Sequence, residues 1–219
     1  MPKELETMSA FFEKRVDTYD EHMLANVLGC KEGYELMAQL IPKKAHTLLD
    51  LGCGTGLELD HIYKKFPDIK VTGIDLCEAM LSKLRDKHKS KSPTLILGDY
   101  FEQDLGTDRF DCAVSFESLH HFDHISKTAL YKKIYTALKK GGVYIECDYM
   151  ASSLQEEQAL FEECAQLRKS QNIKADQYVH FDTPCCTESQ IAMLTDAGFV
   201  NIEQMMKIGG TVMLAAHKD

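Results

Sequence analysis

The sequence predicts an α/β protein in which helices cover both faces of a mainly parallel sheet. Short β-branched or leucine-rich runs alternate with segments of helical periodicity, a pattern typical of βαβ units. The predicted strands are residues 46–51, 69–74, 94–98, 110–116 and 142–148. The first strand runs directly into the glycine-rich turn LGCGTG. Two later strand-like runs, 199–207 and 211–217, are separated by Gly-Gly, which favours an antiparallel hairpin.

Helical periodicity fills the segments between and after these strands. The predicted helices are residues 57–66, 77–90, 126–139, 152–171 and 187–196. The third is expected to end at the sequence KKGG, because basic side chains favour a helix C-terminus and glycine caps it. Thr187 is expected to cap the last helix, which stops at Gly198. Near the N-terminus, four residues recur at helical spacing, which predicts an N-terminal helix that carries them on one face: Phe12, Arg15, Tyr19 and Met23.

Length and charge limit the class of protein. The chain of 219 residues, 44% of them hydrophobic, is long enough for one well-cored domain and too short for two. A formal net charge of -9 argues against a nucleic-acid partner. Because there is no basic segment followed by an apolar core at the N-terminus and no long apolar window, we expect a soluble, cytoplasmic protein without membrane contact.

Cysteine spacing gives no sign of a metal site. The eight cysteines include no C-x-x-C pair and no matching histidine spacing, so no metal is expected. Most are expected to be small buried side chains. Adjacent Cys185 and Cys186 are the exception, since they allow either a soft-metal site or an ordinary loop.

The turn after the first strand leaves the backbone open to a ligand. Gly52, Gly54 and Gly56 alternate with other residues, so a bound molecule can approach main-chain N–H groups closely. This spacing differs from the G-x-G-x-x-G of dinucleotide-binding enzymes. Asp50 precedes the turn, and its carboxylate repels a pyrophosphate but attracts an ammonium or sulfonium group. The turn therefore favours a cationic nucleoside as ligand.

Two more aspartates follow the next two strands, at the edge where open α/β sheets bind ligands. Asp75 ends the second strand, where a carboxylate can accept hydrogen bonds from both hydroxyls of a ribose. Asp99 follows the third strand, where it can accept one from an adenine amine. Either alone is explained as well by a turn or a helix cap. Together with Asp50, they indicate a nucleoside site.

These motifs resemble those of the class I S-adenosylmethionine-dependent methyltransferases over nearly the whole chain. LDLGCGTG is similar to the family's first motif, GIDLCEAML to its ribose-binding segment, GDY to its adenine contact, FDCAVSFESLHHF to its fourth strand and ALKKGGVYIECD to its fifth. Lys140 departs from the proline common in that last motif. The resemblance implies a Rossmann-like three-layer sandwich with a seven-stranded, mostly parallel sheet, a C-terminal antiparallel hairpin, an N-terminal helical lid and a helical insertion after strand five.

The same resemblance implies S-adenosyl-L-methionine as cofactor, S-adenosyl-L-homocysteine as product, and a set of contacts. Asp75 is expected to hold the ribose, Leu76 and Tyr100 to flank the adenine, Asp99 to take its amine, and Ser115 to lie beside the cofactor at the end of strand four. The residues expected to bind the cofactor are Arg15, Tyr19, Asp50, Gly52, Cys53, Gly54, Asp75, Leu76, Met80, Asp99, Tyr100, Ser115 and Phe116.

The resemblance also divides the single domain into parts. We expect an N-terminal helical cap, a cofactor-binding core, an insertion that covers the substrate, and a terminal helix with a hairpin, at residues 1–45, 46–150, 151–186 and 187–219. Related small-molecule methyltransferases close their pocket with an N-terminal helix. Arg15 or Tyr19 can then reach the methionine carboxylate or the methyl group, although an ordinary amphipathic helix docked on the core has the same spacing.

Methyl transfer depends mainly on alignment, and it needs a base only where the acceptor carries a proton. His120 and His121 follow the fourth strand and are candidate catalytic residues, as is Tyr19. Relatives with different acceptors carry the same LHHF sequence, so a structural role for one histidine stays open. The acceptor is expected to be a small molecule beneath residues 151–186.

Tyr149, Tyr178 and His180 are candidate contacts of that acceptor, and the protein is expected to act as a monomer or homodimer. Three alternatives remain open. One is thiol or arsenic methylation through Cys147, Cys185 or Cys186. Another is a non-catalytic S-adenosylmethionine-binding protein. A nicotinamide oxidoreductase of the same architecture is disfavoured by the glycine spacing and the closing hairpin.

Overall fold

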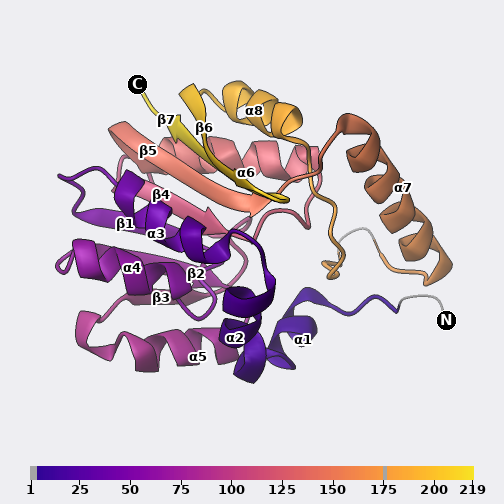
Figure 1. Ribbon diagram of the computed structural model, residues 1–219, viewed down its shortest axis with the longest axis horizontal. Helices are drawn as coiled ribbons and strands as arrows, with labels where there is room; N and C mark the ends of the chain where they lie inside the picture. The colour runs from indigo at the N-terminus through magenta and orange to yellow at the C-terminus, as the bar shows by residue number, and fades with distance from the viewer. Residues whose placement is uncertain (1–3, 175–176) are drawn as a thin grey trace.

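One seven-stranded sheet organises the molecule in the computed structural model, which describes residues 4–174 and 177–219 (Figure 1). The strands are β1 (Thr47–Leu51), β2 (Lys70–Asp75), β3 (Thr94–Leu97), β4 (Phe110–Phe116), β5 (Leu138–Tyr149), β6 (Val200–Ile208) and β7 (Thr211–His217). Their order across the sheet is β3-β2-β1-β4-β5-β7-β6. The predicted fold class, including all seven strands, is confirmed.

The first five strands, β1 through β5, pair in parallel with one another, and the last two strands join the sheet by antiparallel pairing. β7 runs antiparallel to both β5 and β6. Gly209 in the turn between β6 and β7 has a φ of 61°, which glycine adopts without strain. The chain enters the sheet at β1, moves outward to β3, and then returns to add β4 on the other side of β1. This reversal opens a crevice at the carboxyl ends of β1 and β4, where open α/β sheets bind ligands.

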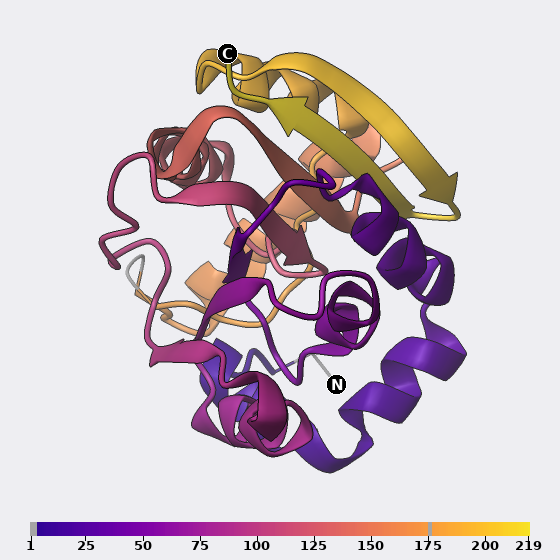
Figure 2. The same cartoon turned by 90° about the vertical axis from the view of Figure 1, so that its left-hand side faces the viewer.

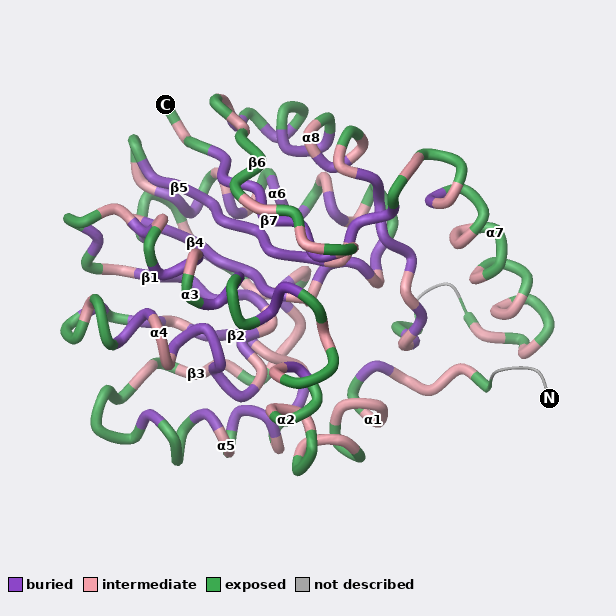
Figure 3. The backbone as a smooth tube through the Cα atoms, viewed as in Figure 1, coloured by how far each residue is buried: buried purple, intermediate pink, exposed green. Residues whose placement is uncertain are grey.

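Helices cover both faces of the sheet, as predicted. The face with α3 (Cys30–Leu40), α4 (Leu57–Lys65) and α5 (Glu78–Lys87) and the face with α6 (His124–Ala137) and α8 (Thr187–Asp196) each hold one hydrophobic cluster. Adjacent strand residues alternate between them: Leu48 belongs to the first cluster and Leu49 to the second. Figure 2 shows the β6–β7 hairpin along one end of this layered arrangement. Figure 3 shows the strands as mostly buried.

Two predicted helix boundaries are wrong. α6 ends at Ala137, and β5 begins at the next residue, so KKGG lies inside a strand instead of capping a helix. The pairing between β4 and β5 shifts register there, and Gly141, with a φ of 76°, allows the irregularity. Thr187 is the first residue of α8 and not its cap, a position that Cys186 takes without a side-chain hydrogen bond.

The N-terminal segment forms two short helices, α1 (Met8–Glu13) and α2 (Val16–Asn26), where one was predicted. Arg15 stands at the break between them. The rings of Phe12 and Tyr19 still meet edge to face, with centroids 6.1 Å apart. Phe12 and Tyr19 therefore still lie side by side, although they stand on separate helices and Arg15 stands at the break.

The inserted helix α7 (Leu154–Ser170) stands apart from the sheet in Figure 1. Glu157 is its one buried residue, and Leu154 is 54% exposed. The predicted apolar face of this helix is therefore not packed against the core as a continuous stripe. In the part of the chain that the structure describes, no helix is long and apolar enough to cross a membrane.

Candidate active site

The glycine-rich turn after β1 is held by the end of β2. Gly52, Gly54 and Gly56 have φ values of 70°, 46° and 72°, which disfavour any residue with a Cβ atom. The N–H of Gly54 donates to Asp75 Oδ2 at 2.8 Å, and the N–H of Cys77 donates to Asp75 Oδ1 at 2.8 Å. Burial raises the pKa of Asp75, while these backbone bonds oppose the rise. A fixed carboxylate thus lies at the carboxyl ends of β1 and β2, beside the glycine-rich turn.

A cavity of about 50 Å³ lies in front of this turn. Seven residues predicted to bind the cofactor line it: Tyr19, Gly52, Gly54, Asp75, Leu76, Met80 and Tyr100. The other lining residues are Met8, Ser9, Phe12, Cys77, Glu117, Ser118, His121 and Phe122. The structure therefore brings the predicted ribose, adenine and methionine contacts together, and adds α1 and the residues after β4.

Five of the residues predicted to contact the cofactor line neither this cavity nor the larger one beside it: Ser115, Phe116, Cys53, Asp50 and Asp99. Ser115 donates to or accepts from the Tyr144 hydroxyl at 2.7 Å, beneath the face that α6 covers. Phe116 stacks on Tyr34 on the opposite face, with ring centroids 4.0 Å apart. Strand alternation turns both side chains away from the edge, and neither lines a described cavity. The side chains that reach the small cavity here are those of Glu117 and Ser118, just beyond β4, and not those of Ser115 and Phe116.

Cys53 and Asp50 lie behind the turn. A Cβ atom on Gly73 would be 2.8 Å from Cys53 Sγ, so that thiol packs against β2. Asp50 is 1% exposed and lies next to Glu58, and burial with the neighbouring carboxyl raises the pKa of Asp50 well above its ordinary value. Burial likewise raises the pKa of Glu58 to about 7. Asp50 therefore does not present its carboxylate to the cavity, contrary to the expected contact with a cationic ligand.

Asp99 occupies the turn after β3, and its Oδ1 accepts a hydrogen bond from the N–H of Phe101 at 2.8 Å. It does not line the cavity. Burial and then the nearby Asp99 charge raise the pKa of Tyr178. Tyr178 also meets Phe122 edge to face, with centroids 5.4 Å apart. This predicted acceptor contact thus lies beside Asp99, on the side predicted for adenine.

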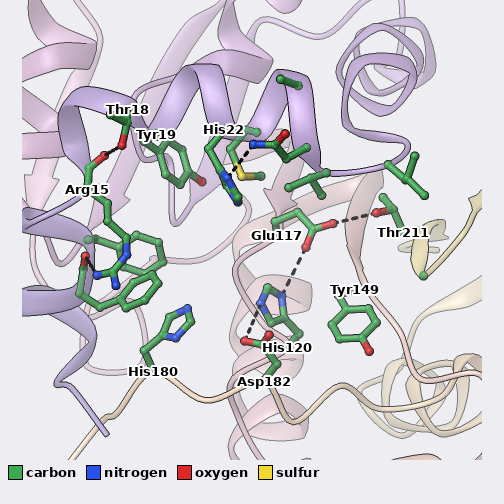
Figure 4. Close-up of a pocket in the computed structure, with 18 of the residues that line it drawn as sticks. Arg15, Thr18, Tyr19, His22, Glu117, His120, Tyr149, His180, Asp182 and Thr211 are labelled. Atoms are coloured by element: carbon green, nitrogen blue, oxygen red, sulfur yellow. Dashed lines mark hydrogen bonds and ion pairs between the residues drawn. The ribbon is translucent and has the colours of Figure 1, made fainter. Parts of the chain in front are cut away.

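A second cavity, of about 910 Å³, adjoins the first, and Figure 4 shows residues that line it. It is lined by residues of α1 and α2, by the loop after β4, by the end of β5 and by the inserted segment. Arg15, Tyr149 and His180 line it, whereas Tyr178 does not. Four residues line both cavities: Phe12, Tyr19, Glu117 and His121. The two cavities therefore meet at these four side chains.

His120 is a cation at neutral pH. Its Nδ1 lies 2.5 Å from Asp148 Oδ1, and the other oxygen of Asp148 accepts from the N–H of Leu119 at 2.8 Å. Burial opposes the charged form, but Asp148, Glu117 and Asp182 outweigh it and raise the pKa of His120 to about 9. His120 lines the large cavity only. A protonated imidazole cannot accept a proton, so His120 is not suited to act as a base at neutral pH.

His121, in contrast, is uncharged at neutral pH. Burial and the neighbouring His120 cation lower the pKa of His121 well below its ordinary value. Its Nδ1 lies 3.3 Å from the Phe181 carbonyl oxygen, which assigns the proton to Nδ1 and leaves Nε2 as an acceptor. His121 is therefore the histidine with a free lone pair among the residues that line both cavities.

Glu117 is the main residue that the sequence interpretation missed. It follows β4 directly, as Asp75 and Asp99 follow or end their strands, so the rule that located those aspartates also applies to it. Burial raises the pKa of Glu117 to about 7, and the nearby His120 charge opposes the rise.

The inserted segment and the N-terminus close the large cavity together. Thr7 forms a bridge with Val179, the N–H of Met8 donates to the Tyr178 carbonyl, and the N–H of His180 donates to the carbonyl of Glu6. The ring of His180 stacks on Phe11, with centroids 3.4 Å apart. A movement of α1 must therefore move this part of the inserted segment as well.

The cysteines do not form a common site. Cys147 belongs to the hydrophobic cluster beneath α3, and Cys185 belongs to the cluster beneath α6 and α8. Cys186 Sγ lies 3.3 Å from the Ser189 hydroxyl. All three are buried, and burial raises the pKa of each thiol. None lines either cavity, so the geometry gives no support to thiol or arsenic chemistry.

The chain is similar to known methyltransferases, and the family model that it matches covers the core of the sheet. A family model described as "Methyltransferase domain" matches residues 48–142, which run from β1 into β5. The chain is 29% identical over 113 residues to a carboxy-S-adenosyl-L-methionine synthase of Campylobacter curvus, covering 51% of this chain and 47% of that protein. It is 26% identical over 229 residues to the enzyme of the same name from Campylobacter lari, covering 94% and 92%.

A malonyl-[acyl-carrier protein] O-methyltransferase of Priestia megaterium is 30% identical over 110 residues, 50% of this chain and 39% of that one. Several of these matches thus span only about half of the relative. Among solved structures, a putative O-methyltransferase of Nostoc punctiforme superposes with a TM-score of 0.71 at 21% identity, covering 97% of this chain and 62% of that one. Human N-acetylserotonin methyltransferase in complex with SAM gives 0.68 at 18%, covering 97% and 59%.

Proposed function

The chain belongs to the class I S-adenosylmethionine-dependent methyltransferases, and from that premise we propose that it transfers a methyl group to a small-molecule acceptor in the large cavity. The observation that carries the proposal is the meeting of the two cavities at Phe12, Tyr19, Glu117 and His121. A methyl donor in one cavity and an acceptor in the other would face each other at these side chains, which is the alignment that in-line transfer needs.

The residues around the small cavity fit an adenosyl cofactor. Asp75 offers carboxylate oxygens, Leu76 and Met80 offer apolar contacts, and the glycine turn leaves its backbone accessible. Bound S-adenosylmethionine supplies a methyl group on a positively charged sulfur. The cavity of about 50 Å³ is smaller than the roughly 300–1,000 Å³ of usual ligand pockets. Met8 and Phe12 of α1 line it, so we expect α1 to move when the cofactor enters.

Hydrogen exchange tests this lid. We expect the amides of residues 8–26 to exchange more slowly with S-adenosylhomocysteine bound, because contacts with the ligand offset the conformational entropy that α1 and α2 lose when they become ordered. The amides of α6, whose residues line neither cavity, serve as the internal control and should not change. Equal protection of residues 8–26 with and without the ligand would mean that these helices are a fixed part of the core.

Two side chains at the junction suit the reaction for different reasons. The free lone pair of His121 can accept a hydrogen bond from an acceptor. Burial and nearby carboxylates raise the pKa of Tyr19, so its hydroxyl stays protonated and acts as a donor. His120 instead holds Glu117 and Asp182 near its two nitrogens, at 3.6 and 3.7 Å. We therefore propose His121 and Tyr19 as contacts of the reacting groups and His120 as a positioning residue.

The sequence relatives named carboxy-S-adenosyl-L-methionine synthases raise a second possibility. Their product, as its name says, carries an added carboxyl group. In this chain Glu117 stands at the junction, and Asp182 lines the large cavity beside it. Two carboxylates repel another carboxylate, which disfavours that product here. Mass spectrometry distinguishes the two reactions, because methyl transfer changes the mass of the acceptor and yields S-adenosylhomocysteine.

The proposal is tested with methyl-labelled S-adenosylmethionine and a small-molecule cell extract. We expect label to enter a low-molecular-weight product in the presence of the protein. Binding of S-adenosylhomocysteine without any transfer to small molecules would instead support a non-catalytic binding protein. Labelling of RNA in preference to small molecules would contradict the proposed acceptor class.

Separate substitutions distinguish the two sides of the inserted segment. His180→Ala is expected to lower the rate of transfer about tenfold and to leave the affinity for S-adenosylhomocysteine unchanged, because His180 lines only the large cavity. Tyr178→Ala is expected to weaken S-adenosylhomocysteine binding several-fold, because Tyr178 lies beside Asp99 and Phe122. Calorimetry and initial rates measure the two effects. The same effect from both substitutions would contradict this separation.

A further inference from the structure

Glu117 combines an unusual backbone with an unusual location. Its φ is 48°, a left-handed conformation that residues other than glycine adopt rarely and that is concentrated at functional sites. It lines both cavities, and it is the acidic residue that does so among the described residues. The backbone at the end of β4 thus places a carboxylate at the point where donor and acceptor meet.

The carboxyl group of Glu117 is fixed from two sides. Its Oε1 accepts a hydrogen bond from the Thr211 hydroxyl at 3.1 Å, and its Oε2 lies 3.6 Å from His120 Nδ1. The side chain is 8% exposed. Figure 4 shows His120 between Glu117 and Asp182, with both carboxylates directed toward its ring.

Negative charge exceeds positive charge at this end of the cavity. The cation of His120 is matched by Asp148 directly beneath it, which leaves Glu117 and Asp182 in excess. Asp182 Oδ1 is buried and accepts no hydrogen bond from the described part of the chain. Such an arrangement attracts a cation and repels an anion.

The arginine of the cavity does not offset this charge. The Nη1 of Arg15 donates to the Phe11 carbonyl at 2.9 Å, and its Nη2 lies 3.6 Å from Glu6. The guanidinium also stacks over the Phe11 ring at 3.6 Å. Arg15 is therefore held by Phe11 and Glu6, and Figure 4 shows it apart from Glu117 and Asp182. Tyr19 and Tyr149 add aromatic rings, which favour a bound cation.

We propose that the acceptor is a primary or secondary amine, bound as its ammonium ion by Glu117 and Asp182, an inference that rests on the proposed methyl transfer. The ammonium passes one proton to the Glu117 carboxylate, which frees the nitrogen lone pair. That lone pair forms the bond to the methyl carbon while the bond between this carbon and sulfur breaks. The electrons of the broken bond stay on sulfur, which becomes a neutral thioether. The nitrogen keeps the positive charge as the methylated ammonium, and Glu117 returns its proton to solvent.

The charge state of Glu117 agrees with this role. Because burial raises its pKa to about 7, the carboxyl group can both accept and release a proton near neutral pH. His121 can accept a second hydrogen bond from the same nitrogen through Nε2. An alcohol or a carboxylic acid would bring no positive charge to Asp182, whose cationic neighbour, His120 at 3.7 Å, is already shared with Asp148 and Glu117.

Calorimetry with matched probes tests the proposal. 2-Phenylethylamine, 2-phenylethanol and 3-phenylpropanoate are titrated into the protein saturated with S-adenosylhomocysteine. We expect the amine to bind about tenfold or more tightly than the other two, and Glu117→Gln to remove that preference. Glu117→Gln should keep the circular dichroism spectrum of the wild type, which shows that the fold is intact, and it too is saturated with S-adenosylhomocysteine before the titrations. Glu203→Gln on the exposed side of β6 is the matched control and should behave like the wild type.

The outcomes separate this inference from the function on which it rests. Equal or tighter binding of the alcohol or the carboxylate, no binding of the amine, or an amine preference that survives Glu117→Gln would overturn amine recognition. An amine preference lost in Glu117→Gln, with no transfer of labelled methyl to any small molecule, would support amine recognition and overturn the proposed methyl transfer.

Discussion

Replacement of Asp75 by alanine is expected to weaken the binding of S-adenosylhomocysteine at least about tenfold, because each lost charge-assisted hydrogen bond to a ribose hydroxyl contributes about 1.5–3 kcal/mol. Asp75 lines the small cavity, and its two oxygens already hold the N–H groups of Gly54 and Cys77. The substitution therefore removes the ligand contact and also loosens the turn beneath it. Isothermal calorimetry measures the change in affinity.

A second variant separates these two effects. Asp75→Asn keeps one oxygen acceptor of the same shape and loses the charge, so it should fold normally and still bind more weakly than the wild type. Asp86→Ala, at an exposed position of α5, is the matched control and should bind normally. Unchanged affinity in both Asp75 variants would remove the assignment of this cavity to the cofactor, whatever the acceptor.

The fold was predictable because its signals are local. Each strand of the parallel core is a short apolar run, and each is followed by a turn or a helical segment, so chain order alone gives the architecture. The error at KKGG has a physical reason. Lys139 and Gly141 are favourable at a helix end, but β5 needs partners along β4, and tertiary pairing outweighs the local preference there.

The cofactor side of the site was predictable where one residue ends one strand. Asp75 is the last residue of β2, and no knowledge of distant residues is needed to place it. Ser115 and Phe116 were misplaced because they still belong to β4, where alternate side chains point to opposite faces of the sheet. Glu117 and Ser118 reach the crevice because the strand has ended before them.

Contacts between side chains of different structural elements could not be predicted. Asp50 and Glu58 face each other across a turn, and Asp148 reaches His120 from the neighbouring strand, 28 residues away in sequence. These pairs decide charge: Asp148 makes His120 a cation, and His120 in turn keeps His121 neutral. The sequence therefore indicates two adjacent histidines but not their opposite protonation states, which follow from the fold.

Loss of the Asp148 charge is expected to have the largest effect on stability. Asp148 is 1% exposed and faces the buried His120 cation, so Asp148→Asn leaves a buried charge without its partner. The raised pKa of His120, about 9 in place of 6.5, stabilises the folded protein fully below pH 6.5, and this contribution is lost as the pH rises through 9. At pH 6 the variant should lose about 3 kcal/mol of unfolding free energy.

Urea unfolding followed by circular dichroism at pH 6 and at pH 9.5 measures this loss. The difference between wild type and Asp148→Asn should be large at pH 6 and should shrink at pH 9.5, where His120 is mostly neutral in both proteins. Asp108→Asn is the matched control, because Asp108 pairs with Lys218 at the surface, and exposed pairs contribute only about 0–1 kcal/mol. A loss of the same size at both pH values would mean that Asp148 stabilises the fold through its backbone contact with Leu119 and not through the charge of His120.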